Sequence, residues 1–130
     1  MTDRYAEHRR VAQEVGADAV ALVPGSNFDR LFKKSFHSNE RPLVVVIPHI
    51  GDPVAVVPNL ELHSFDLIGF EGEVFDWRDQ DGYDDAFAAL GRTLPVRSLA
   101  VEGQIMRVFI AQALQNATPG LTLIDAEKEI

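Results

Sequence analysis

Apolar residues along the chain gather in short runs, and the two densest runs are 43–47 and 54–57. They contain only leucine, valine, isoleucine and alanine, and β-branched side chains suit a pleated strand. Neither run alternates apolar with polar residues, so both are expected to be covered on two faces, like central strands of a helix-flanked sheet. Two prolines and a glycine separate them, in Pro48-His49-Ile50-Gly51-Asp52-Pro53. The pattern therefore predicts a hairpin at the centre of the core.

Three segments are predicted before this hairpin. A helix is expected from Asp3, a capping residue, to about Val15, with Gly16 as its stop. Its buried positions are spaced three and four residues apart: Tyr5, His8, Ala12 and Val15. Residues 18–23 indicate a compact strand, and residues 28–36 fit either a short helix or an irregular segment.

After the hairpin, helical and strand patterns alternate. The predicted segments are a helical turn in 59–65, a strand in 70–77, a helix after Asp81, a strand at 97–101, a helix from Gly103 or Gln104 to about Asn116, a strand at 121–124 and a helix capped by Asp125. The penultimate helix has the clearest buried stripe: Met106, Phe109, Ile110, Ala113 and Leu114. This order predicts a single α/β domain over residues 1–130, with a mixed β-sheet flanked by helices.

The final residues, 125–130, have the pattern of a helix that stops in its second turn. We therefore expect residues 1–130 to be a fragment of a longer chain, with a further domain after Ile130.

The composition excludes several classes of function. The chain has no cysteine, which rules out disulfides, thiolate catalysis and thiolate metal sites and is compatible with the cytoplasm. Its net charge of −8 argues against nucleic acid or an anionic membrane as a general partner. A local basic patch of Arg30, Lys33 and Lys34 is too short to change this expectation. We also expect no membrane-spanning segment, because no apolar run is long enough.

The common catalytic motifs are missing from the sequence. It contains no glycine-rich phosphate loop and no nucleophile elbow, and its four histidines stand far apart. Asp79-Gln80-Asp81-Gly82 resembles part of a calcium loop, but Trp77 and Ala88 occupy two positions where that loop needs ligands. We therefore predict no catalytic residue and no metal ligand in this chain.

The loop from Ser35 to Pro42 is the better candidate for function. It places an aromatic ring, an imidazole and a guanidinium close together, in Phe36, His37 and Arg41, just before a buried strand. An exposed set of this kind could hold a carboxylate or line the entrance of a pocket. The structural alternative is that Arg41 and its neighbour Glu40 are solvated and that Phe36 packs on the core.

Several short phrases follow one another along the chain: Gly16-Ala17-Asp18-Ala19-Val20, Pro24-Gly25-Ser26-Asn27, the 35–42 loop, Gly51-Asp52-Pro53, Val56-Val57-Pro58-Asn59-Leu60-Glu61, Trp77-Arg78-Asp79, Ala100-Val101-Glu102-Gly103, Met106-Arg107 and Leu123-Ile124-Asp125-Ala126. Their order resembles that in the N-terminal domain of the creatinase, prolidase and aminopeptidase P family. One departure lies after Asn27, where Arg30, Phe32 and Lys33 replace a tyrosine, a threonine and a glycine of many relatives. Loss of that glycine favours a helix there and puts a substrate-facing role of this loop in doubt.

The resemblance implies a non-catalytic domain of an Xaa-Pro aminopeptidase or dipeptidase. In that family a separate C-terminal catalytic domain carries two Asp, one His and two Glu, which hold two divalent ions such as Mn, Co or Zn for cleavage of a proline-containing peptide. None of those ligand motifs can be placed here. The family's N-terminal domain helps to form a homodimer and walls the active-site mouth, and by position Phe36, His37 and Arg41 would face that mouth.

Two other functions stay open at this stage. One is a non-enzymatic protein-interaction module of the same fold, whose acidic surface would suit a basic partner. The other is a free-standing enzyme, which the absence of a convergent acid, base and nucleophile disfavours. The reading frame after Ile130 separates the peptidase from the interaction module.

Overall fold

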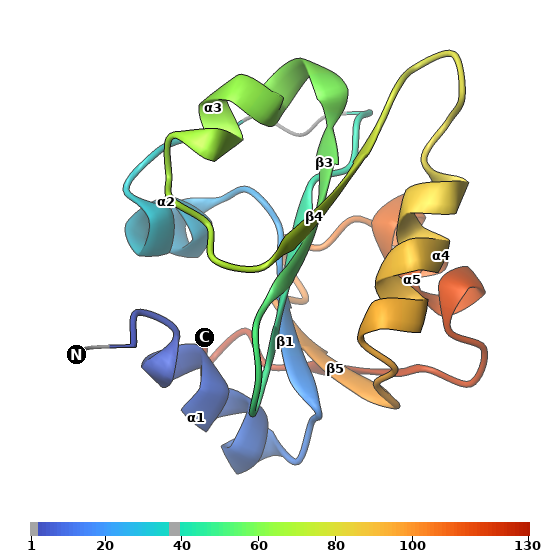
Figure 1. Cartoon of the computed structure of the whole chain (residues 1–130). Coiled ribbons are helices and arrows are strands. Elements are labelled where there is room, and N and C mark those ends of the chain that lie inside the picture. The colour runs from blue at the N-terminus through green and yellow to red at the C-terminus, as the bar shows by residue number, and fades with distance from the viewer. Residues whose placement is uncertain (1–2, 37–39) are drawn as a thin grey trace.

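Six strands form one mixed sheet in the order β4-β3-β2-β1-β5-β6, with helices on both faces (Figure 1). The computed structural model describes residues 3–36 and 40–130. The strands are β1 (Ala19–Leu22), β2 (Val44–Pro48), β3 (Val54–Pro58), β4 (Glu73–Trp77), β5 (Ser98–Val101) and β6 (Thr122–Asp125). The helices are α1 (Ala6–Val15), α2 (Ser26–Phe32), the 3₁₀ turn η1 (Asn59–Glu61), α3 (Leu62–Asp66), α4 (Asp84–Thr93) and α5 (Val108–Ala117). The predicted α/β class and mixed sheet are confirmed.

The predicted hairpin is formed by β2 and β3. The two strands pair antiparallel, with Val44 opposite Val56 and Val46 opposite Val54. Every residue of both strands is buried, as the unbroken apolar runs predicted. β2 lies in the middle of the sheet and β3 lies one strand in from the β4 edge.

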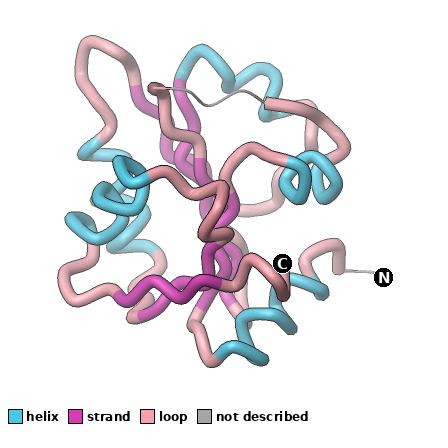
Figure 2. The backbone as a smooth tube through the Cα atoms, turned by 180° about the vertical axis from the view of Figure 1, so that it is seen from behind, coloured by secondary structure: helices cyan, strands magenta, loops and turns pink. Residues whose placement is uncertain are grey.

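Alternate side chains of the strands serve two separate cores. Val20 and Leu22 of β1 pack in the cluster that also contains residues of α1, α2 and α3. Ala19 and Ala21 pack on the opposite side, with residues of α4 and α5. Figure 2 shows the same arrangement from behind, with the strands between the two groups of helices. The sheet is therefore covered on both faces, which explains its almost purely apolar central strands.

The first helix ends where the sequence predicts. Gly16 adopts φ 75°, a left-handed conformation that glycine accepts without a steric penalty. Asp3 does accept a hydrogen bond from the backbone N–H of Tyr5 at 3.0 Å, but the helix itself begins at Ala6. Residues 26–32 form helix α2, as the absence of a glycine at position 33 favours, and Lys33 ends it with φ 57°.

The start of α5 differs from the prediction. The helix begins at Val108 and not at Gly103 or Gln104, because Arg107 is extended at φ −80° and ψ 150°. At the predicted start, the backbone N–H groups donate to side chains of the C-terminal segment: Gly103 to Asp125 at 3.1 Å and Gln104 to Glu127 at 3.0 Å. Residues 103–107 therefore form a loop that projects from the end of β5.

The helix predicted from Asp125 is also absent from the described part of the chain. Asp125 is the last residue of β6, and residues 127–129 form a single turn. The N–H groups of Glu129 and Ile130 donate to the carbonyl of the fully buried Ala126, at 3.0 and 2.9 Å. The Asp125 carboxylate accepts a hydrogen bond from the N–H of Glu127 and so caps this turn. Asp125 is therefore a cap, as predicted, but the segment that follows it is a turn and not a helix.

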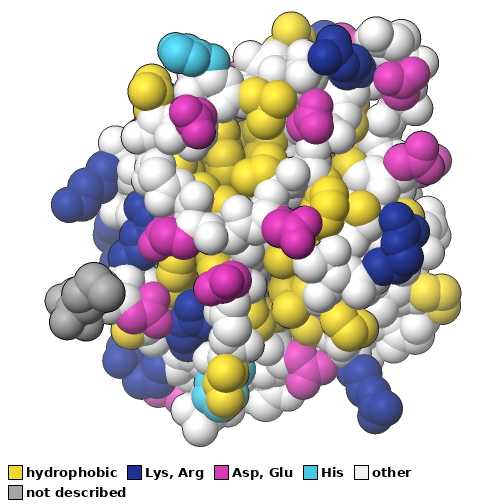
Figure 3. Space-filling model, viewed as in Figure 1, with side chains coloured by type: hydrophobic (Ala, Val, Ile, Leu, Met, Phe, Trp, Pro, Cys, Tyr) yellow, Lys and Arg dark blue, Asp and Glu magenta, His cyan; other side chains and the backbone are white. Residues whose placement is uncertain are grey.

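Acidic side chains are spread over the face that carries the open edge of β4, among apolar ones (Figure 3). This distribution agrees with the net charge of −8. In residues 3–36 and 40–130, no helix has the length and apolar character needed to cross a lipid bilayer.

Candidate functional site

One end of the sheet collects the carboxyl ends of five strands. β1, β3, β4, β5 and β6 run in one direction, and β2 runs in the other. The segments that leave these five strands therefore lie along the same end of the sheet, together with the segment that enters β2. In open α/β sheets this is the end at which ligands bind.

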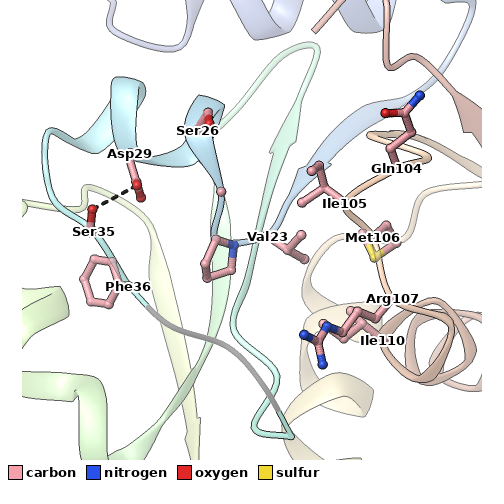
Figure 4. A pocket seen from close by; sticks show the side chains of 12 residues that line it. Val23, Ser26, Asp29, Ser35, Phe36, Gln104, Ile105, Met106, Arg107 and Ile110 are labelled. Carbon is pink, nitrogen blue, oxygen red and sulfur yellow. Dashed lines mark hydrogen bonds between the residues drawn. The ribbon is translucent and has the colours of Figure 1, made fainter.

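The main cavity lies at this end, between the β1–α2 turn and the β5–α5 loop (Figure 4). Its volume is about 600 Å³, within the range of small-molecule sites. The lining residues come from three segments: Val23, Pro24, Gly25 and Ser26; Asp29, Ser35 and Phe36; and Gln104, Ile105, Met106, Arg107 and Ile110. The cavity exists because α5 starts late and leaves residues 103–107 as a loop.

A buried polar contact joins the two segments on either side of this cavity, α2 and the end of β5. Glu102, at the end of β5, is only 3% exposed, and its Oε2 accepts a hydrogen bond from Nδ2 of Asn27 in α2 at 2.8 Å. Asn27 Oδ1 in turn accepts from Arg30 at 3.2 Å, and Arg30 also donates to Glu7 of α1 at 3.2 Å. The contact holds α2 against the β5–α5 loop, across the end of β1.

Glu102 is incompletely satisfied within the described residues. Its Oε1 has no hydrogen-bond partner there. Burial raises the pKa of Glu102 above its usual 4.5, the Asn27 hydrogen bond opposes that shift, and the charge of Glu127 adds to it. A carboxylate in this position destabilises the fold whenever it is ionised.

Replacing Glu102 by glutamine should therefore stabilise the chain at neutral pH. Between the unfolded pKa near 4.5 and the raised folded pKa, the folded state binds more protons than the unfolded state. The contribution of Glu102 to stability therefore falls as the pH rises through this window, and glutamine carries no such charge. Thermal melts of Glu102→Gln and wild type should differ most at pH 7 and converge below pH 4.5.

An exposed carboxylate provides the control for this comparison. Glu14→Gln removes a charge that is 58% exposed, and its melting temperature should follow that of wild type at every pH. A Glu102→Gln variant that is less stable than wild type at pH 7 and equal to it at pH 4 would contradict the raised pKa of Glu102 and the destabilising effect of its charge.

Phe36 does not form the exposed aromatic that the sequence suggested. The side chain is 6% exposed, and its ring centroid lies 5.7 Å from that of Phe28 and 6.0 Å from that of Phe65. The alternative, in which Phe36 packs on the core, describes its position. Phe36 also lines the main cavity, on the same side as Asp29 and Ser35. His37 lies outside the described residues.

Arg41 forms an ion pair within the chain. Its Nε and Nη2 donate to the two carboxylate oxygens of Asp79 at 2.9 and 2.7 Å, and Nη1 lies 3.6 Å from Glu40. This pairing raises the pKa of Arg41 and lowers that of Asp79. Trp77 donates its indole N–H to the carbonyl of Pro42 at 3.2 Å, so residues 40–42, which lead into β2, are held to the end of β4. Arg41 lies outside the lining of the main cavity.

The described residues do not fit a metal centre. Residues 3–36 and 40–130 contain no group of three or more His, Cys, Asp and Glu side chains arranged to hold an ion.

Of the residues that line the main cavity, sequence reasoning singled out only Phe36 as a candidate functional residue. It also missed the contact between Asn27 and Glu102, which belong to phrases that carry the family resemblance, because nothing in those phrases showed that the two residues meet. The available signal was their position: each phrase follows a predicted strand, and parallel strands end on the same side of a sheet.

The comparisons identify similar proteins. Residues 4–130 match the family described as the Creatinase/Prolidase N-terminal domain. The N-terminal domain of Xaa-Pro dipeptidase from Lactobacillus brevis has a similar structure, with a TM-score of 0.84 and 18% identity over 97% of this chain and 96% of that one. No curated protein matches by sequence.

Two larger proteins contain a similar domain. Prolidase from Thermococcus sibiricus gives a TM-score of 0.82 and 22% identity over 100% of this chain and 36% of that chain. Dipeptidase PepE from Mycobacterium ulcerans gives a TM-score of 0.78 and 25% identity over 97% of this chain and 34% of that chain. The present chain therefore corresponds in size to about a third of these proteins.

Proposed function

Because the chain belongs to the Creatinase/Prolidase N-terminal domain family, we propose that it is the non-catalytic N-terminal domain of a metal-dependent Xaa-Pro peptidase. Its role there is to shape substrate access and to take part in dimerisation. The observation that carries the proposal is the family match over residues 4–130. The larger similar proteins, a prolidase and a dipeptidase, support it because the rest of each could hold the catalytic machinery.

In this proposal the chemistry belongs to a C-terminal catalytic domain. That domain would hold the two divalent ions and cleave the proline-containing peptide. The N-terminal domain would contribute the carboxyl end of its sheet, where the segment entering β2 is fixed by two contacts: Arg41 with Asp79, and Trp77 with Pro42. A segment that is already held in place in the free protein can wall a substrate entrance with little loss of conformational entropy on binding.

Exposed apolar side chains support the dimerisation part of the proposal. Leu60 on η1 and Leu67 just after α3 are 73% and 66% exposed. The neighbouring edge strand β4 has Val74 at 37% exposure and an open row of backbone hydrogen-bonding groups. Apolar surface beside an open strand edge is typical of a contact between subunits.

Two measurements test the proposal. The reading frame after Ile130 should encode the two Asp, one His and two Glu ligands, and the chain 1–130 alone, assayed with a divalent metal and an Xaa-Pro dipeptide, should show no turnover. Robust turnover by this chain alone overturns the proposal. A downstream frame without the ligands also overturns it, in favour of a non-enzymatic interaction module.

The access role has its own test in the full-length enzyme. Arg41→Ala should raise KM for an Xaa-Pro dipeptide several-fold with kcat little changed, because it removes one of the two contacts that hold residues 40–42 to the end of β4. Arg10→Ala is the matched control, since Arg10 is 64% exposed and also ion-paired, with Glu14 at 3.7 Å. Equal kinetic effects of the two variants would contradict an access role for this segment.

A further inference from the structure

The main cavity lies at a particular point of the sheet topology. β1 and β5 are parallel neighbours, and the chain leaves them toward opposite faces of the sheet. After β1 it forms α2, which packs in the core of α1 and α3, whereas after β5 it forms α5, which packs with α4. The two connections diverge and leave a crevice above the strand ends. This divergence is the point at which open α/β sheets bind small ligands.

The walls of the cavity differ in charge. Asp29 and Ser35 lie on the α2 side, and Gln104 and Arg107 lie on the β5–α5 side (Figure 4). Between them the surface is apolar and includes Val23, Ile105 and Met106. A carboxylate and a guanidinium on facing walls, with apolar surface between them, match a ligand that carries a cation at one end and an anion at the other.

Each charged group can accept a further partner. The Asp29 Oδ2 accepts a hydrogen bond from the Ser35 hydroxyl at 2.9 Å, while its Oδ1 has no partner among the described residues. A carboxylate oxygen can accept more than one hydrogen bond, so the Asp29 carboxylate can also accept from a ligand's ammonium group. Arginine has five N–H donors in a planar fork, so Arg107 can bind a carboxylate in addition to contacts within the chain.

We propose that this cavity binds a small zwitterion with an apolar middle, the chemistry of a free apolar amino acid or a short apolar peptide. The ligand's ammonium group contacts Asp29, its carboxylate contacts Arg107, and its side chains lie on Ile105 and Met106. The cavity of about 600 Å³ has room for more than one residue. The proposal does not require proline in the ligand or a catalytic domain, so it goes beyond the function proposed above.

The experiment is a titration of the 130-residue chain with leucine and with trileucine, followed by the amide signals of its NMR spectrum. Domains of this size and fold exist as separate solved chains, such as the one from Lactobacillus brevis, so the chain can be studied alone. We expect saturable shifts confined to residues 23–29, 35–36 and 104–110, which contain the lining of the cavity. The ligand that binds more tightly distinguishes an amino-acid site from a peptide site. Absence of saturable shifts with both ligands overturns the proposal.

Substitutions and capped ligands test the two charged contacts separately. Asp29→Asn and Arg107→Gln should each weaken binding about tenfold. N-acetylation of trileucine should also weaken binding, and the capped ligand should then be insensitive to Asp29→Asn. C-terminal amidation should make binding insensitive to Arg107→Gln in the same way. If the capped and free peptides bind alike, apolar contact alone explains the binding and the proposal is wrong.

A further variant guards against loss of fold. Ser26→Trp places a large ring from an exposed position into the cavity and should abolish binding without lowering the melting temperature, whereas Gln13→Trp, on the exposed side of α1, should leave binding unchanged. Unchanged binding by Ser26→Trp overturns the proposal. Because the probes lack proline and no catalysis is measured, failure here leaves the peptidase proposal intact, and the converse also holds.

Discussion

Replacing Phe36 by alanine is expected to lower the free energy of unfolding by about 3–4 kcal/mol. The side chain is 6% exposed and packs against Phe28 and Phe65, within a cluster of aromatic rings that joins α2 to α3. Truncation removes a buried ring and leaves a cavity that the surrounding strands cannot fill, because β2 and β3 are fixed by their pairing. Urea denaturation followed by circular dichroism measures the loss.

Two further variants show whether the effect comes from burial. Phe36→Leu keeps most of the apolar volume and should lose far less stability than the alanine variant. Leu67→Ala, at a position that is 66% exposed, should change stability by less than about 0.5 kcal/mol. A Phe36→Ala variant as stable as Leu67→Ala would show that Phe36 is not part of the core and would restore the exposed aromatic suggested by the sequence.

Gly72→Ala is expected to destabilise the chain by about 3 kcal/mol or more. A Cβ atom at this position would collide with the carbonyl oxygen of Pro53 and lie 2.6 Å from its carbonyl carbon. Both atoms are backbone, so no side-chain rotation can relieve the contact. Gly72 and Pro53 lie immediately before Glu73 and Val54, the first pair of the β3–β4 ladder, so the collision acts on the register of the edge strand. Thermal unfolding and the m-value in urea report the change.

Gly120→Ala separates collision from backbone strain. Gly120 has φ 85°, and nothing lies within 4 Å of a Cβ atom built there. The variant should therefore lose only about 1 kcal/mol, the cost of placing an L-residue in the left-handed region. If the two glycine variants lose equal stability, β4 can move away from Pro53 and the close approach is not essential.

The elements with strong local patterns could be predicted well. The runs 43–47 and 54–57 were long enough, and apolar enough, to require burial on both faces, and the proline and glycine between them required a reversal. The same holds for the periodic face of α1 and its stop at Gly16. In each case the information lies within a few residues of the element that it specifies.

The elements whose limits depend on distant partners were predicted less well. Nothing between Gly103 and Arg107 prevents a helix, yet the N–H groups of Gly103 and Gln104 are taken by carboxylates 22 and 23 residues away. The turn at the C-terminus follows from the burial of Ala126, which no local pattern indicated. Residues 36 and 41 were singled out as neighbours, but one packs into the core and the other pairs with Asp79.

The sequence by itself determined the class of fold, the hairpin and the family, because these depend on apolar periodicity, on turn residues and on the order of short phrases. The tertiary structure decided where α5 begins and that the ring of Phe36 is buried in the core. It also decided that Asn27 and Glu102 form a hydrogen bond across the end of β1. The physical reason is that a buried hydrogen bond or an aromatic contact needs both partners in place. Partners 75 residues apart, such as Asn27 and Glu102, meet only when the parallel strands before them have paired.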